Sequence, residues 1–365
     1  MRTRTHSDYL ILFCIGFLVI FGLIMLASAS SNLGKVKFDD AYYYLKHQLL
    51  YGFSIGAVGF LLGLKIHYKV YARFAFPMLL LSIVLLILVF TPLGIVANNS
   101  ARWLSLGPVR FQPAELLKLT VIIYLASWLA KDARRRMHFG KGLVPLMAVI
   151  GVVAFLLLKQ PSTSTVAILF GAAFAMYFVS GAKLRYIALL CGGAAVALAL
   201  VIAITPYRME RIKNFISPEA DLARGGFHLK QAQIAIGSGE VFGVGFGNST
   251  TKLGLLPEPV GDSIFAVIAE ELGFVGSSVL VGIFLFLVLR IFLTAKHAPD
   301  MFGELLLVGF GAIIASQAIV NIGATSGVLP LTGTPLPFIS YGGTALAVFM
   351  TMGGIIVNIS KYSNA

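Results

Sequence analysis

Ten long apolar runs follow one another along this chain, and each is long enough to be interpreted as a membrane-spanning segment. They cover approximately residues 9–29, 45–64, 74–92, 115–130, 143–158, 165–181, 186–204, 274–294, 304–324 and 343–359. Hydrophobic residues make up 58% and charged residues 12% of the 365 positions, which excludes an ordinary soluble protein. We therefore predict an all-α fold: one polytopic membrane domain, residues 1–365, with about ten transmembrane helices.

The distribution of charge predicts how these helices are oriented. A net charge of +13 is compatible with nucleic-acid binding, but Lys and Arg are scattered over short loops between the apolar runs. The positive-inside rule predicts this pattern, so we expect membrane lipids and no nucleic acid as the partner. The densest loop contains Lys131, Arg134, Arg135, Arg136 and Lys141. We expect this loop and both termini to be cytoplasmic.

Two smaller features limit other interpretations. Residues 27–29, Ala-Ser-Ala, resemble a signal-peptidase site, but the run before them is longer than a signal h-region, so an uncleaved anchor is expected. The six histidines are dispersed, and both cysteines lie inside apolar runs. Neither a zinc site nor a disulfide framework is therefore expected.

The longest segment outside the apolar runs covers about residues 205–263, and we expect it to be an extracytoplasmic loop that folds against the helices. Three carboxylates, Asp262, Glu270 and Glu271, lie where this loop enters the next apolar helix. A carboxylate in such a place is costly unless it has a partner or a function. The simplest interpretation of Asp262 is a helix N-cap, and the alternative is a group that performs chemistry.

A second polar group precedes the fourth apolar run. Arg102 and Arg110 lie in the loop before it, and Glu115 and Lys118 lie three residues apart on the helix. Residues at this spacing share a helix face, so an ion pair between the two side chains is one interpretation. The other is a polar cavity lined by this helix and by the helix that follows Asp262.

Two further segments belong to the outer face. Arg208 and Arg211 follow the seventh run, either as solvated side chains at a helix end or as an anchor for a polyanionic head group such as pyrophosphate. Residues 327–343 contain no charge. An apolar loop outside the membrane is expected to pack into the bundle and to form the wall of a cleft.

Several motifs together resemble the SEDS family of shape, elongation, division and sporulation proteins. They are ARWLSLGPVRFQPAELLKL (residues 101–119), YRMER (207–211), GGFHLKQAQIAIGSG (225–239), LPEPVGDSIFAVIAEELG (256–273) and TGTPLPFISYGG (332–343). The resemblance extends over nearly the whole chain. Residues 248–252, NSTTK, and the run from 332 to 343 resemble the division branch (FtsW) more than the elongation branch (RodA).

This resemblance implies ten spanning helices and a peptidoglycan glycosyltransferase that polymerises lipid II at the outer face of the bacterial cytoplasmic membrane. It also implies a class B penicillin-binding protein, a transpeptidase, as partner, with other divisome proteins, lipid II and undecaprenyl-linked glycan as further partners. The family's essential aspartate falls on Asp262, and its helix-borne Glu and Lys fall on Glu115 and Lys118. The other residues that we expect to bind substrate are Arg102, Arg110, Arg208, Arg211 and Lys252.

The expected chemistry is transfer of a lipid-linked glycan to a sugar hydroxyl. Asp262 is the candidate general base, and the charge growing on the pyrophosphate requires cations from Arg or Lys, a divalent metal, or both. We therefore expect a divalent cation, Mg²⁺ or Mn²⁺, as a possible cofactor, with unknown ligands, and no organic cofactor.

The chain departs from the family pattern at two places, and other functions compete. Asp262 stands between Gly261 and Ser263 instead of Thr and Phe, and Ser162 occupies the position of a second family acid. The alternatives are an elongation polymerase of the RodA type, a lipid II flippase or transporter with the carboxylates as a coupling-ion site, and a scaffold. A coupling site is expected near the bilayer midplane, whereas Asp262 is expected at the outer rim.

Overall fold

The computed structural model describes residues 7–97, 100–107, 109–132, 138–216 and 225–363. In these residues the long helices are α1 (Tyr9–Phe38), α4 (Lys69–Leu88), α5 (Pro113–Lys131), α7 (Val144–Lys159), α8 (Thr163–Val179), α9 (Leu184–Ile204), α12 (Ile264–Lys296), α13 (Met301–Thr325) and α14 (Gly343–Ser360). A further span is continuous from Tyr43 to Lys65 through α2 (Tyr43–His47), the π-helical turn η1 (Gln48–Phe53) and α3 (Ser54–Lys65). The π-helical turn η2 (Phe139–Leu143) extends α7 at its start.

These helices confirm the predicted fold class. In the described part of the chain, nine helical segments are long and apolar enough to cross a membrane, and α8 is a shorter apolar helix. Each corresponds to one of the ten predicted runs. α9 exposes apolar side chains such as Leu200 and Ile204, whereas α5, α13 and α14 are largely buried. Glu115 and Lys118 of α5 and Gln317 and Asn321 of α13 are buried, so these polar side chains face protein and not lipid.

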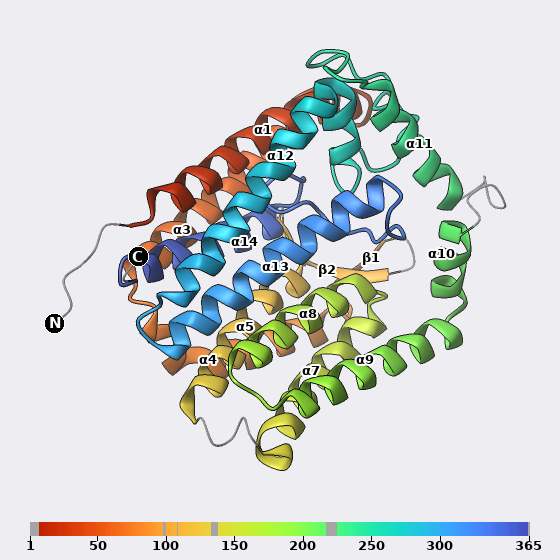
Figure 1. Cartoon of the computed structure of the whole chain (residues 1–365). Helices are drawn as coiled ribbons and strands as arrows, with labels where there is room; N and C mark the ends of the chain where they lie inside the picture. Colours follow the sequence, from red (N-terminus) through yellow and green to blue (C-terminus); the bar gives the residue numbers. More distant parts are fainter. Residues whose placement is uncertain (1–6, 98–99, 108, 133–137, 217–224, 364–365) are drawn as a thin grey trace.

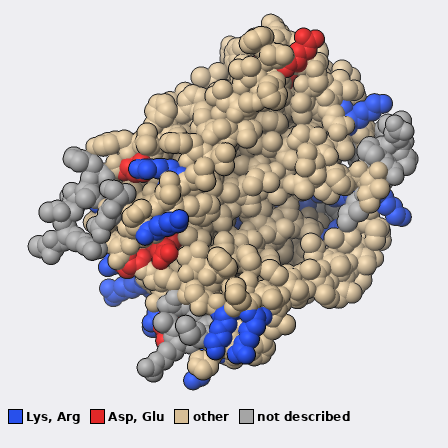
Figure 2. All heavy atoms as spheres, viewed as in Figure 1, with Lys and Arg blue, Asp and Glu red and all other residues tan. Residues whose placement is uncertain are grey.

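Figure 1 shows α12 and α13 crossing the middle of the molecule, with α1 along one edge and α9 along the opposite edge. The start of α1 and the end of α14 lie side by side, and Asp8 N donates to Ser360 Oγ at 3.0 Å. Figure 2 shows many Lys and Arg side chains near this end of the bundle and tan, uncharged surface across the middle. This separation is the pattern that the positive-inside rule describes.

Small residues allow the close packing of α3 against α14. A Cβ atom at Gly59 would lie 2.1 Å from Thr351 Oγ1, and one at Gly63 would lie 2.9 Å from the backbone nitrogen of Ile355. Close approach of this kind is a usual source of helix association in lipid, where apolar burial gives little advantage over contact with lipid tails.

The segment between α4 and α5 forms a small sheet that the sequence interpretation did not include. Its strands are β1 (Gly94–Ala97), β2 (Ser100–Leu106) and β3 (Val109–Phe111), antiparallel in the order β1-β2-β3. Leu104 pairs with Phe111, and Ser105 pairs with Arg110. The sheet thus presents Arg102 and Arg110 from a hydrogen-bonded framework.

The long outer segment contains α10 (Pro206–Ile216) and α11 (Gly225–Ser238), and a loop then returns to α12. α12 is interrupted at Gly273, whose φ of 68° lies in a region that favours glycine. Around this interruption the loop bonds to the helix, because Val244 N donates to Glu270 O and Phe274 N donates to Glu240 O. The outer segment therefore folds against the bundle, as expected.

Candidate active-site cleft

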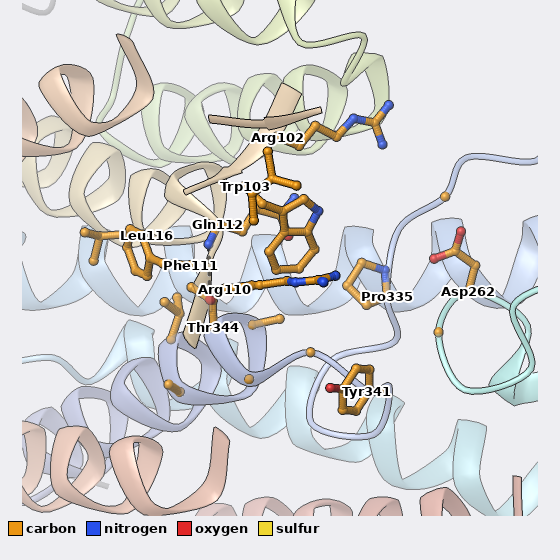
Figure 3. Close-up of a pocket in the computed structure, with 18 of the residues that line it drawn as sticks. Arg102, Trp103, Arg110, Phe111, Gln112, Leu116, Asp262, Pro335, Tyr341 and Thr344 are labelled. Carbon is orange, nitrogen blue, oxygen red and sulfur yellow. Dashed lines mark hydrogen bonds between the residues drawn. The ribbon is translucent and has the colours of Figure 1, made fainter. Parts of the chain in front are cut away.

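A cleft of about 1650 Å³ lies where the small sheet, the end of α7, α10 and the last loop meet. It is lined by Arg102 and Trp103 of β2, Arg110 of β3, Asp262, and Tyr341 of the last loop, among other residues. Figure 3 shows the side chains of Arg102 and Arg110 extending from the strands toward the part of the cleft that contains Pro335 and Asp262. The uncharged last loop forms part of the wall, in agreement with the expectation from its composition.

Asp262 is a partly buried residue that lies just before α12 and contributes to the wall of the cleft. The N-cap of α12 is Ser263, and its side chain makes no capping bond. The Asp262 carboxylate accepts no hydrogen bond from any residue that the structure describes. The N-cap interpretation is therefore wrong, and the carboxylate is available to a ligand.

Burial and the nearby charge of Glu258 raise the pKa of Asp262 to about 6, and Arg211 and Arg102 partly offset the increase. A carboxyl group with this pKa is largely ionised at neutral pH. It is also a stronger base than an ordinary aspartate, because its proton affinity lies nearer to the working pH.

Three hydrogen bonds hold the backbone around Asp262, one to each of three consecutive carbonyl oxygens. The donors are Tyr341 N to Val260 O (2.8 Å), Ser340 Oγ to Gly261 O (2.7 Å) and Asn321 Nδ2 to Asp262 O (2.9 Å). Asn321, which is buried on α13, also donates to Thr334 O at 2.7 Å. The last loop and α13 therefore position the segment that carries the free carboxylate.

Two of the predicted arginines are held by the turn at the end of α7. Arg102 Nε donates to Gln160 O at 3.0 Å, and Arg208 Nη2 donates to Leu158 O at 3.2 Å. Arg208 also donates to the hydroxyl of Thr163 at 2.8 Å. These acceptors orient the guanidinium groups of two residues that line the cleft.

Arg110 and Arg211 complete the set of predicted arginines that line the cleft. Arg211 Nη1 donates to Leu331 O at 3.0 Å. The structure thus brings all four predicted arginines and Asp262 to one cleft. Four guanidinium groups around one cavity are suited to a pyrophosphate, which arginine binds through paired hydrogen bonds.

Glu115 and Lys118 are placed differently from the arginines. Their side chains form an ion pair of 2.7 Å, and the whole residues are 3% and 1% exposed. They are absent from the residues that line the cleft. Lys118 Nζ also donates to Gln317 Oε1 at 2.7 Å, and Gln317 Nε2 donates to Pro335 O at 2.8 Å. The pair is therefore connected through Gln317 to the last loop.

Lys252 lies outside the cleft as well, in a second buried group. Its ammonium donates to Glu271 Oε1 at 2.7 Å, to Ser28 Oγ at 2.9 Å and to Gly247 O at 2.8 Å. These three bonds use all its donors. The predicted role of Lys252 in substrate binding therefore gains no support from its position, and its contacts instead connect the outer loop to α1 and α12.

Glu270, which precedes Glu271 on α12, holds the same loop. Its carboxylate accepts hydrogen bonds from Ser249 Oγ at 2.6 Å and from Thr250 N at 2.9 Å, and also from Thr251 Oγ1. Of the three acids that the sequence groups together, only Asp262 faces the cleft. The other two satisfy buried donors.

A divalent cation fits the cleft only with help from the substrate. Asp262 and Glu258 are the carboxylates among its lining residues, and the described residues contain no group of three or more His, Cys, Asp or Glu that could hold a metal. Magnesium commonly binds through one or two carboxylates together with substrate phosphates. This donor set is therefore suited to a cation that arrives with a pyrophosphate.

Sequence reasoning missed the residues that position Asp262. Gln317 and Asn321 lie four residues apart on α13, and Gln48 of η1 accepts a hydrogen bond from Gly342 N at 3.1 Å. Each is a buried amide inside an otherwise apolar run. An amide inside an apolar run is rare, because it is costly unless it is hydrogen-bonded. This rarity could have indicated from the sequence that these residues have a structural role.

Comparison with known proteins gives matches over nearly the whole chain. The model of the family of cell cycle proteins that comprises FtsW, RodA and SpoVE matches residues 8–365. Stage V sporulation protein E of Bacillus subtilis (strain 168) is 34% identical over 362 residues, which are 99% of this chain and 98% of that protein. A probable peptidoglycan glycosyltransferase FtsW of Trichlorobacter lovleyi is 37% identical over 357 residues, 97% and 93% of the two chains.

Two solved structures are also similar. One is a chain from a study of the structural coordination of polymerization and crosslinking by a peptidoglycan synthase complex, with a TM-score of 0.78, 28% identity and 97% of each chain covered. The other is the rod shape determining protein RodA of Thermus thermophilus, with a TM-score of 0.71, 27% identity and 98% of each chain covered. These findings confirm the resemblance read from the motifs: the chain belongs to the FtsW, RodA and SpoVE family of cell cycle proteins, the SEDS family.

Proposed function

We propose that this protein is a peptidoglycan glycosyltransferase that polymerises lipid II at the outer face of the bacterial cytoplasmic membrane during cell division. The observation that carries the proposal is the free carboxylate of Asp262 in a cleft lined by four arginines. The names of the FtsW relatives and the similarity to a peptidoglycan synthase complex support the same activity.

In the proposed reaction, Asp262 removes the proton from the acceptor sugar hydroxyl as the oxygen attacks the anomeric carbon of the donor chain. A sugar hydroxyl is a weak nucleophile until a positioned base removes this proton. The bond from the anomeric carbon to pyrophosphate then breaks. Arg102, Arg110, Arg208 and Arg211 stabilise the charge on the departing group. A bound Mg²⁺ or Mn²⁺, held by Asp262 and Glu258 together with phosphate oxygens, would supply further positive charge.

A flippase would use the carboxylates as a coupling-ion site near the middle of the bilayer. Asp262 instead precedes the first residue of α12, at a helix end. Glu270 and Glu271 are engaged by hydrogen bonds from the outer loop, from Ser28 and from Lys252. These positions favour the polymerase.

The decisive experiment measures polymerisation of fluorescent lipid II by the purified protein, with and without a class B penicillin-binding protein. We expect glycan strands from the parent and a fall of roughly 10²- to 10⁴-fold in Asp262→Asn, because the amide cannot accept the proton. Asp39→Asn is the matched control, since the Asp39 side chain is 88% exposed and is not among the residues that line the cleft. An Asp262→Asn variant with near-parental rate would remove Asp262 from the mechanism. Transport of lipid II across liposomes without polymerisation would favour the flippase.

The proposed orientation has both termini in the cytoplasm, with the class B penicillin-binding protein and other divisome proteins as partners. Cysteine labelling of whole cells tests the orientation. Cysteine in place of Gly140, in the turn before α7, should react with a membrane-impermeant reagent only after permeabilisation. Cysteine in place of Lys230, on α11, should react in intact cells. Both positions are exposed. The reverse labelling would contradict the placement of the cleft outside.

A further inference from the structure

A second pocket, of about 340 Å³, adjoins the cleft at Asp262. Asp262, Arg211 and Gly333 line both cavities. The volume lies within the range of about 300–1,000 Å³ typical of small-ligand sites. We call this second cavity the His228 pocket, and its polar lining is formed by Glu210, Arg211, His228, Asp262, Ser263, Asn321, Thr325, Thr332 and Thr334.

The lining of the His228 pocket differs chemically from that of the cleft. Hydroxyl and amide groups predominate, and Arg211 is the single Arg or Lys among its described lining residues. Glu210 adds a carboxylate to the lining. Phe215 and Leu229 add apolar surface. Hydroxyl groups combined with apolar patches suit a sugar ring, which presents hydroxyls at its edge and C–H groups on its faces, better than they suit a pyrophosphate.

His228 itself is suited to a neutral ligand. Its Nε2 lies 2.7 Å from Ser263 Oγ, which fixes the ring beside the residue that follows Asp262. Burial, with a contribution from Arg211, lowers the pKa of His228 below its ordinary value. The ring is therefore neutral at physiological pH, with one nitrogen donating and the other accepting. A neutral imidazole can bond to a hydroxyl and offers no ionic attraction to a phosphate.

The reaction requires two substrates to meet at one carboxylate. A general base must be within hydrogen-bond reach of the hydroxyl from which it removes a proton. The acceptor sugar must therefore lie beside Asp262, and the anomeric carbon of the donor must lie there too. Two cavities of different chemistry that share Asp262 meet this requirement without forcing both substrates into one volume.

We propose that the His228 pocket binds the terminal sugar ring of the acceptor and directs its hydroxyl to Asp262, while the arginine-lined cleft holds the pyrophosphate of the donor chain. This assignment rests on the proposed glycosyltransferase function. A new bond forms between the acceptor oxygen and the donor anomeric carbon, the bond to pyrophosphate breaks, and the acceptor proton passes to Asp262. The pyrophosphate leaves with the bonding electron pair.

Thiol protection tests the assignment without turnover. In full-length protein with Cys14 and Cys191 changed to Ser, Thr332→Cys places a thiol in the His228 pocket and Ser105→Cys places one in the cleft only. The lipid-free disaccharide of lipid II should slow alkylation of Thr332→Cys about threefold at twice its Kd, and should leave Ser105→Cys unchanged. Undecaprenyl pyrophosphate should protect Ser105→Cys and leave Thr332→Cys unchanged. Protection of Ser105→Cys alone by the disaccharide, or of neither thiol, would overturn the assignment.

Kinetics give an independent measurement. His228→Ala should raise the KM for lipid II about tenfold, the worth of one good hydrogen bond, with a smaller change in kcat. His228→Gln, which keeps a donor and an acceptor, should recover much of the loss. Lys230→Ala, exposed on the same helix, is the control and should behave as the parent. An unchanged KM in His228→Ala, with the thermal stability of the parent, would contradict the proposal.

The two proposals fail in different ways. If the parent does not polymerise lipid II, the proposed function fails, whatever the protection pattern. If the parent polymerises but the disaccharide does not protect Thr332→Cys, only the acceptor assignment fails.

Discussion

Replacing Lys118 with Met tests whether the buried ion pair of α5 is an anchor for the cleft. Met has a similar length but no charge, so the change leaves the Glu115 carboxylate buried without its cation. It also removes the 2.7 Å bond to Gln317 Oε1 and the contact with the Phe349 ring, whose centroid lies 5.1 Å from Nζ. The Lys118 and Glu115 side chains are 2% and 4% exposed, so water cannot replace these partners.

The loss of stability expected for Lys118→Met follows from the burial of the ion pair. A three-residue ion pair on a helix surface contributes about 0.2–0.5 kcal/mol, whereas breaking a buried pair costs about 3–5 kcal/mol. We expect Lys118→Met to lower the free energy of unfolding by the larger amount, measured as a lower midpoint of thermal or denaturant unfolding in detergent. Lys131→Met removes an exposed cation from the same helix and should change stability by less than about 0.5 kcal/mol.

A second variant separates stability from activity. Glu115→Leu combined with Lys118→Met leaves no unpaired charge and should recover most of the lost stability. Polymerisation should remain impaired, because Gln317 has lost the partner that orients its bond to Pro335. A Lys118→Met protein within about 0.5 kcal/mol of the parent would refute the reasoning on burial. A double variant with parental activity would show that the pair serves only to satisfy itself.

Four further predictions concern Asp262 and its surroundings. Because burial raises the pKa of Asp262 to about 6 and a base must be deprotonated, kcat/KM should rise about tenfold per pH unit below about pH 6 and level off above it. The raised pKa also means that the folded state disfavours the ionised form of Asp262. Asp262→Asn should therefore raise the midpoint of thermal unfolding relative to the parent above about pH 6, but not at pH 4. A variant with the same midpoint as the parent at both pH values would contradict this prediction. Gly333 has a φ of 67°, and a Cβ there would lie 3.2 Å from Asp262 Oδ2, so Gly333→Ala should reduce activity even where the protein still folds, as checked by polymerisation and thermal unfolding. Asn321→Leu should leave the carbonyls of Asp262 and Thr334 without their donor, which should lower the free energy of unfolding by about 1–3 kcal/mol for each buried group. A polymerisation rate equal to that of the parent would exclude Asn321 as a positioning residue.

Different parts of the candidate site could be predicted from the sequence to different extents. Arg102, Arg110, Arg208 and Arg211 were predicted because they lie before the fourth and after the seventh apolar run, on the expected outer face, and all four line the cleft. Lys252 was selected on the same reasoning but lies in a separate buried group. Charge alone does not distinguish a residue that faces a cavity from one that neutralises a buried partner.

The three acids show the same limit. In the sequence Asp262, Glu270 and Glu271 form one cluster, and nothing in their spacing separates their roles. The interruption of α12 at Gly273 and the return of the outer loop bring hydrogen-bond donors to the two glutamates. Asp262, before the start of the helix, receives none from the described residues. The amides of α13 were missed because their partners lie 13 to 199 positions away in the sequence. The three-stranded sheet was also missed, although its strands follow one another in the sequence.

The apolar runs were enough to predict a bundle of about ten membrane-spanning helices, because segments of bilayer length have few other ways to satisfy their backbone hydrogen bonds in lipid. Its motifs were also sufficient to indicate the family. Which polar groups meet could be seen only in the folded molecule. The carbonyls of residues 260–262 bond to the last loop and to α13, up to 81 positions farther along the chain. Those contacts are set by helix packing and loop closure, and they leave one carboxylate free between two cavities.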